Sequence, residues 1–96
     1  MTLDSNRIKE LKNSFSERIY IQVEKWNLYL GDAGLAEALA LECNAYLDQG
    51  ASKAARQALE SVQVKFAGGS THLPLARLIP PDQIFDLEEI LEPYCN

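Results

Sequence analysis

The sequence predicts one α+β domain, mostly helical, with a two-stranded β-hairpin at about residues 62–79 flanked by helices. Three observations support this fold class. Apolar residues recur every three or four positions over most of the chain, they alternate with polar residues at 62–66, and a Gly-Gly pair follows that alternation. A chain of 96 residues accommodates one hydrophobic core, so we expect residues 1–96 to form a single domain.

The first predicted helix covers residues 5–29, with Asp4 or Ser5 as its N-cap and the glycine at position 31 near its end. Its apolar stripe contains Ile8, Leu11, Phe15, Ile19, Val23, Trp26 and Leu30. Because Trp26 lies on this stripe, we expect it to pack in the core rather than to stack on a ligand. An alternative stays open, because apolar and polar residues also alternate at 19–24, which is typical of a half-buried strand.

The remaining elements follow from the same patterns. A second helix is expected from about Asp32 to Gly50 and a third over residues 52–61, where four small or apolar residues share one side. The strand at 62–66 and the apolar run at 73–79 are expected to form the hairpin. Because Pro74 lacks an amide hydrogen, the returning strand is expected either to lie at an edge or to start beyond Pro74. A last helix begins at the Pro80-Pro81 pair and ends near Pro93.

Charge is distributed unevenly along the chain. The formal net charge is −5 and the isoelectric point about 4.7, which argues against a general binder of nucleic acid or anionic membrane. The segment 51–78 is nevertheless basic and the segment 79–96 acidic. Two interpretations are open: the acidic tail pairs with the basic hairpin region, or each patch docks a partner of opposite charge. The candidate partner-binding residues are Lys53, Arg56, Lys65, Arg77, Asp86, Glu88, Glu89 and Glu92.

No motif in the sequence predicts catalysis, a cofactor or a metal site. The segment 67–72 contains two glycines, Ser70 and His72, but it lacks the lysine and the following helix of a phosphate-binding loop, so a hairpin turn is expected. One histidine and two cysteines cannot supply four ligands for structural zinc, and the acidic tail lacks a calcium-binding loop. We therefore expect a protein that is not an enzyme.

The sequence also bears on the compartment. The first ten residues lack the apolar stretch of a secretory signal, and acidic residues interrupt the most apolar region, so we expect a cytoplasmic protein without a membrane span. Cys43 and Cys95 are expected to be unpaired thiols in a reducing compartment, although the sequence does not decide whether they meet.

Two function classes remain. The first is a non-enzymatic protein–protein interaction module with a regulatory or assembly role. The second is a winged-helix-like nucleic-acid-binding protein, which requires a strand at 19–24 and would use the 52–61 helix as reader and the 62–79 hairpin as wing. The small basic footprint and the acidic tail favour the protein-binding class.

Three segments of this chain, residues 17–33 (ERIYIQVEKWNLYLGDA), 62–69 (VQVKFAGG) and 73–80 (LPLARLIP), are similar to a small single-domain family of cyanobacteria without an assigned function. The resemblance extends from about Ser14 to Tyr94. It implies a cytoplasmic protein of a photosynthetic bacterium, with a role such as assembly or regulation of a larger complex. It implies no catalytic residues.

Overall fold

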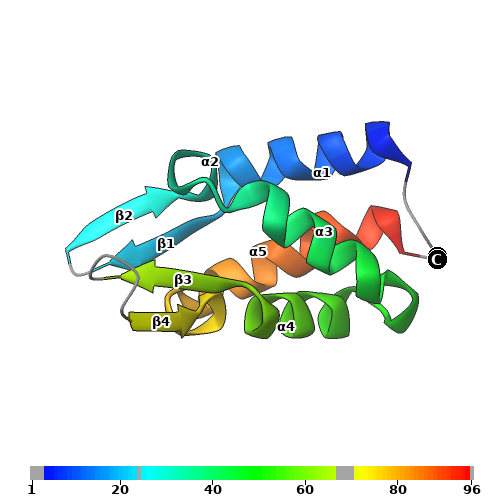
Figure 1. Cartoon of the computed structure of the whole chain (residues 1–96). Helices are drawn as coiled ribbons and strands as arrows, with labels where there is room; N and C mark the ends of the chain where they lie inside the picture. Colours follow the sequence, from blue (N-terminus) through cyan, green and yellow to red (C-terminus); the bar gives the residue numbers. More distant parts are fainter. Residues whose placement is uncertain (1–3, 24, 67–70, 96) are drawn as a thin grey trace.

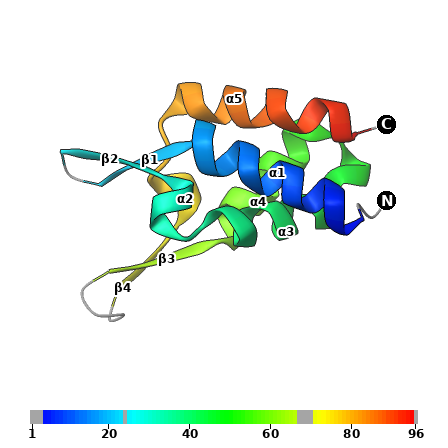
Figure 2. The same ribbon diagram turned by 90° about the horizontal axis from the view of Figure 1, so that it is seen from above.

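A helical body carries two β-hairpins at one end. The computed structural model describes residues 4–23, 25–66 and 71–95. Figure 1 shows the helices α1, α3, α4 and α5 packed together, with both hairpins extending from the same end of the molecule. In Figure 2 the two chain ends lie at the opposite end. The molecule measures 39 × 23 × 22 Å, and the predicted fold class, a mostly helical α+β domain, is confirmed.

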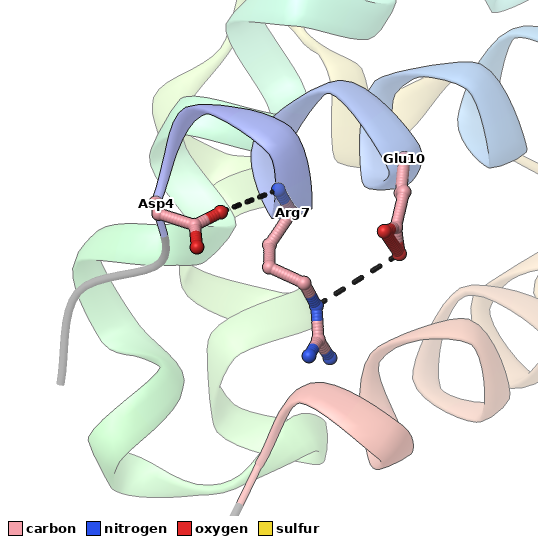
Figure 3. A network of polar contacts seen from close by, with 3 residues as sticks. All are labelled: Asp4, Arg7 and Glu10. Carbon is pink, nitrogen blue, oxygen red and sulfur yellow. Dashed lines mark hydrogen bonds and ion pairs between the residues drawn. The ribbon is translucent and has the colours of Figure 1, made fainter.

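Helix α1 (Ser5–Arg18) begins at the predicted N-cap Asp4, whose carboxylate accepts a 2.8 Å hydrogen bond from the amide of Arg7. The guanidinium of Arg7 lies 3.8 Å from the carboxylate of Glu10 (Figure 3) and also stacks over the ring of Tyr94, 4.6 Å from its centroid. Burial is the main cause that raises the pKa of the Tyr94 hydroxyl, and Glu10 raises it further. These contacts join the start of α1 to the C-terminal end of the chain.

The prediction that the first helix continues to residue 29 is wrong. The helix ends at Arg18, and an antiparallel hairpin follows, formed by β1 (Tyr20–Val23) and β2 (Trp26–Tyr29). The period-two alternative is confirmed over residues 20–23, which pair with 26–29 as a strand. Ile19 and Ile21 are both buried, and an extended segment places residues two apart on the same face. Tertiary burial of alternate β-branched residues outweighs the three-and-four spacing that continues through this segment.

Trp26 was predicted in the core, and this prediction is also wrong: its side chain is 74% exposed. On the opposite face of the hairpin, the rings of Tyr20 and Tyr29 meet edge to face with centroids 5.7 Å apart. Such cross-strand aromatic pairs stabilise a two-stranded sheet.

The second predicted helix is divided. Helix α2 (Leu30–Ala33) ends at Gly34, which has a φ of +73° and reverses the chain before α3 (Ala36–Tyr46). A 3₁₀ turn, η1 (Leu47–Gln49), then leads through Gly50 to α4 (Ala51–Ser61), the predicted third helix. Ala54, Ala55 and Ala58 of α4 are fully buried, so this helix packs closely against α3 and α5.

The predicted second hairpin is present, formed by β3 (Gln63–Phe66) and β4 (Thr71–Pro74), and the predicted turn at 67–70 lies outside the described residues. The prediction that the returning strand covers residues 73–79 is wrong beyond Pro74, because the chain turns there and the amides of Leu78 and Ile79 donate to the carbonyl of Leu75. The 3₁₀ turn η3 (Leu75–Arg77) leads to α5 (Pro81–Leu91), which has proline at its first position as predicted. A last 3₁₀ turn, η4 (Glu92–Tyr94), contains Pro93.

The core lies between α1, α3, α4 and α5. Its largest fully buried side chains come from every one of these helices and from the start of the first hairpin: Leu11, Phe15, Ile19, Ile21, Leu30, Leu39, Leu59, Leu75, Leu87 and Leu91. Gln83 is the buried polar residue of the described chain, and it fixes the first hairpin to α5. Its side-chain oxygen accepts a 3.0 Å hydrogen bond from the amide of Tyr20, and its nitrogen donates to Asp86 over 2.9 Å.

Candidate functional site: a groove between two hairpins

An apolar groove of about 710 Å³ separates the two hairpins. Figure 2 shows the hairpins diverging as they leave the helical body. Among the described lining residues, most come from the first hairpin and the α2–α3 region, and those from the second hairpin all belong to β3. The lining residues are Ile21, Trp26, Asn27, Leu28, Ala33, Leu35, Gln63, Val64 and Lys65.

The first hairpin presents an apolar face to this groove. Its register places Ile21 opposite Leu28 and position 23 opposite Trp26, and residues opposite each other or two apart along a strand share one face. Ile21 is buried at the base of the groove, whereas Leu28 is 37% and Trp26 74% exposed further along. The hairpin therefore holds a large aromatic and a large aliphatic side chain in solvent contact beside a hollow.

The opposite wall is the edge of β3. Val64 is half-buried and pairs with Leu73 of β4, while Gln63 and Lys65 are exposed. Among the described lining residues, Lys65 alone is charged. The groove thus combines an apolar lining with one cation and contains no acidic lining residue within the described ranges.

The basic and acidic candidates on the helices lie beside each other rather than on separate surfaces. Arg56 of α4 and Glu88 of α5 line one hollow of about 410 Å³, and Lys53 and Arg56 line another, of about 560 Å³, together with Glu92. The first of these hollows also contains Phe85, which is 68% exposed. Opposite charges at this spacing partly cancel each other's field, so neither sign dominates here.

The other four candidates are dispersed. Lys65 lines the groove between the hairpins and Arg77 is exposed on η3, whereas Glu89 is exposed on α5 and Asp86 is half-buried where it accepts the hydrogen bond from Gln83. Within the described ranges, no lysine or arginine of residues 51–78 forms an ion pair with a carboxylate of the acidic tail. The eight predicted site residues therefore do not form one surface.

Both cysteines are free thiols, Cys43 in the core and Cys95 half-buried near the end of the chain. Burial strongly raises the pKa of the Cys43 thiol, and the carboxylate of Glu42 and the thiol of Cys95 raise it further. Burial also raises the pKa of Cys95. These thiols remain protonated at neutral pH, which opposes nucleophilic reactivity.

Two kinds of feature are absent from the part of the chain that the structure describes. That part contains no group of three histidine, cysteine, aspartate or glutamate side chains placed to hold a metal ion. It also contains no helix with the length and apolar character needed to cross a membrane.

Sequence analysis alone missed the groove. The signal that could have found it is the alternation at 19–23, which continues with the same period through Trp26 and Leu28 after the turn at Lys25. A hairpin interpretation would have placed Trp26 on the apolar face of two short strands, where no helix covers it.

The fold and this groove define a small, mostly helical protein with a candidate binding surface between two separate β-hairpins. The chain belongs to a family of proteins of unknown function, DUF3181, whose family model matches residues 8–94. This agrees with the resemblance to a single-domain family without an assigned function. No curated protein and no solved structure matches the chain.

Proposed function

We propose that this protein is a non-enzymatic protein–protein interaction module, with a regulatory or assembly role, and that the groove between the hairpins is its docking surface. The observation that supports this proposal is the 74% exposure of Trp26 on the wall of an apolar hollow. A folded chain gains free energy by burying such a side chain, and tryptophan in a pocket is typical of residues that dominate binding energy.

The charge distribution supports a protein partner over a nucleic acid. The chain has a net charge of −5, and Lys53 and Arg56, the charged residues of the proposed reader helix, share hollows with Glu88 and Glu92. Phosphate binding requires cations that act together, so this arrangement gives a poor footprint for DNA or RNA.

The strand pairing also departs from the order that the winged-helix alternative requires. That alternative needs one strand between the first two helices. Two strands occur there, and β1 pairs with β2 rather than with the second hairpin. The proposed wing, β3 and β4, is a separate two-stranded sheet among the described residues.

The proposed setting is the cytoplasm of a cyanobacterium, as the resemblance implies, where the module would act on a larger complex. Fractionation of such a cell with an antibody against the chain tests this setting. Recovery in the cytoplasmic fraction is expected, and recovery only in a periplasmic or membrane fraction would contradict it.

The docking proposal is tested by affinity recovery from native lysate, with each sample divided into nuclease-treated and untreated halves. We compare the unaltered chain with three variants: Trp26→Ala in the groove, Phe85→Ala as a matched exposed aromatic on α5, and Lys53→Glu/Arg56→Glu on α4. A protein that survives nuclease treatment and is lost only with Trp26→Ala is the expected result. A tryptophan at the centre of an interface contributes about 2 kcal/mol or more, which corresponds to at least about a thirtyfold loss in affinity.

Two outcomes contradict the proposal. Loss of the partner with Lys53→Glu/Arg56→Glu but not with Trp26→Ala would move the docking surface to α4. Recovery that disappears with nuclease treatment would favour the nucleic-acid alternative. Circular dichroism of each variant establishes that the fold is intact before recovery is compared.

A further inference from the structure

We propose that the groove receives an extended segment of a partner protein as an added β-strand along the free edge of β3. This inference rests on the proposed function and specifies the occupant and its mode of binding. The occupant has apolar residues at alternate positions and an acidic residue opposite Lys65. Three observations support strand addition: the hydrogen-bond register of the second hairpin, the orientation of its two edges, and the charge of the groove.

The register determines which backbone groups of β3 point into the groove. The amide of Leu75 donates a 2.8 Å hydrogen bond to the carbonyl of Val62, which makes this pair a hydrogen-bonded one. In an antiparallel ladder hydrogen-bonded pairs alternate with non-hydrogen-bonded pairs, so Val64 bonds to Leu73 whereas Gln63 and Lys65 direct their amides and carbonyls away from β4. No backbone hydrogen bond joins these outward groups to any other described residue.

The same reasoning shows that the corresponding edge of β1 is closed. The amide of Leu30 donates to the carbonyl of Ile19, so Tyr20 and Gln22 of β1 point outward. Both amides have partners: Tyr20 donates to the side chain of Gln83 at 3.0 Å, and Gln22 donates to the carbonyl of Leu78 at 2.9 Å. The chain therefore satisfies this edge internally, whereas it leaves the β3 edge open.

The β3 edge is also the one that faces the groove. Figure 1 shows β3 between the first hairpin and β4, and the groove lining includes three residues of β3 and none of β4. The far edge of β4 contains Pro74, which has no amide hydrogen and is a common protection of exposed edges. A strand added to β3 would therefore lie against the apolar face that presents Trp26 and Leu28.

The side chains of the β3 edge indicate what this strand should contain. Residues directly opposite each other in a sheet share a face and interact. Lys65 is the one charged side chain of the described lining, so a carboxylate fits at the partner residue opposite it. The partner residues on either side of that carboxylate lie on the same face of the sheet as the apolar Val64. A second copy of this chain is a poorer occupant, because each copy has a net charge of −5.

The experiment uses a phage-displayed library of ten-residue peptides and the intrinsic fluorescence of Trp26, the single tryptophan of the chain. The six central positions of the library alternate between apolar and polar residues, and one polar position is either acidic or basic. Peptides enriched on the full chain are synthesised and titrated. We expect enrichment of the acidic set and a blue shift of the Trp26 emission as the groove fills.

Backbone substitutions then separate strand addition from other modes of docking. The enriched peptide is N-methylated at an amide that faces β3, or at the next amide, which faces away and is the matched control. In the protein, Lys65→Pro removes both the charge and an outward amide of β3, whereas Lys65→Gln removes only the charge and is the matched control. Each lost backbone hydrogen bond weakens binding by about fivefold to tenfold.

Strand addition is supported if the facing methyl group weakens the titration while the control methyl group does not, and if Lys65→Pro weakens it more than Lys65→Gln does. If Trp26 responds to the peptide but neither backbone change matters, strand addition is overturned and the docking proposal stands. Absence of any enriched peptide overturns strand addition as well, and the recovery experiment decides the docking proposal independently. A blue shift that grows with protein concentration alone would identify a second copy as the occupant and overturn the proposal of a partner segment.

Discussion

Gln83 connects the helical body to the first hairpin, and its replacement by methionine measures that connection. The variant Gln83→Met retains the length and most of the volume of the side chain, but it loses the acceptor for the Tyr20 amide and the donor to Asp86. Gln83 is only 6% exposed, so water does not readily replace these bonds. Leaving a buried or half-buried donor without a partner costs about 1–3 kcal/mol.

The assay is urea unfolding followed by circular dichroism, with Gln57→Met as the control because Gln57 is an exposed glutamine on α4. We expect Gln83→Met to lower the free energy of unfolding by about 1–3 kcal/mol, and each kcal/mol lowers Tm by about 4–8 °C in a domain of this size. Hydrogen exchange followed by NMR should show faster exchange of the Tyr20 amide in the variant.

Equal stability of Gln83→Met and Gln57→Met, with unchanged protection of the Tyr20 amide, would refute the view that Gln83 holds the hairpin. It would also weaken the account of the groove, because the position of Trp26 depends on the attachment of β1. A loss of stability without faster exchange at Tyr20 would assign the effect to the Asp86 bond instead.

Three further predictions concern stability. Asp4→Ala should lower the free energy of unfolding by about 1 kcal/mol in thermal unfolding, because the amide of Arg7 loses its capping acceptor, whereas Asp4→Asn should retain most of it. Gly34→Ala should cost about 1 kcal/mol by urea unfolding although no atom lies within 4 Å of the added methyl group, because the φ of +73° is unfavourable for any other residue; an unchanged midpoint would contradict this. Cys43 has a raised pKa in the folded state, so the folded chain keeps its proton while the unfolded thiol ionises above about pH 8.5, and stability falls as pH rises. Urea unfolding at pH 7–10.5 should therefore show the unaltered chain losing up to about 1.4 kcal/mol per pH unit relative to Cys43→Ala above pH 9, and parallel curves would contradict the assignment.

Much of the helical body was predictable because local signals and tertiary packing agree there. Asp4 caps α1 as predicted, the small residues of α4 pack closely, and Pro81 begins α5. The presence of the second hairpin and its first strand were also predictable, since apolar alternation and a glycine pair both indicate a turn between strands, whereas the returning strand was placed too far along the chain. In each case one pattern dominates the segment.

The candidate site was much less predictable. Five of the eight charged residues chosen from the sequence line three different hollows, and Arg77, Asp86 and Glu89 line none of the three. Sequence distance gives no information about which face of α4 meets α5. Lys65 alone among the eight lines the groove. Trp26 was assigned to the core because the sequence of residues 19–26 fits both the apolar stripe of a helix and the alternation of a strand.

The sequence by itself determined the fold class, the acidic character and the approximate bounds of α4, β3 and α5, because capping, turn chemistry and hydrophobic periodicity act within a few residues. The tertiary structure alone decided whether residues 19–29 form a helix or a hairpin, since burial of Ile19 and Ile21 against the helices outweighs local preference. It also decided that Trp26 faces a groove and that the edge of β3 stays open. Both depend on how two hairpins far apart in the sequence leave one end of the helical body.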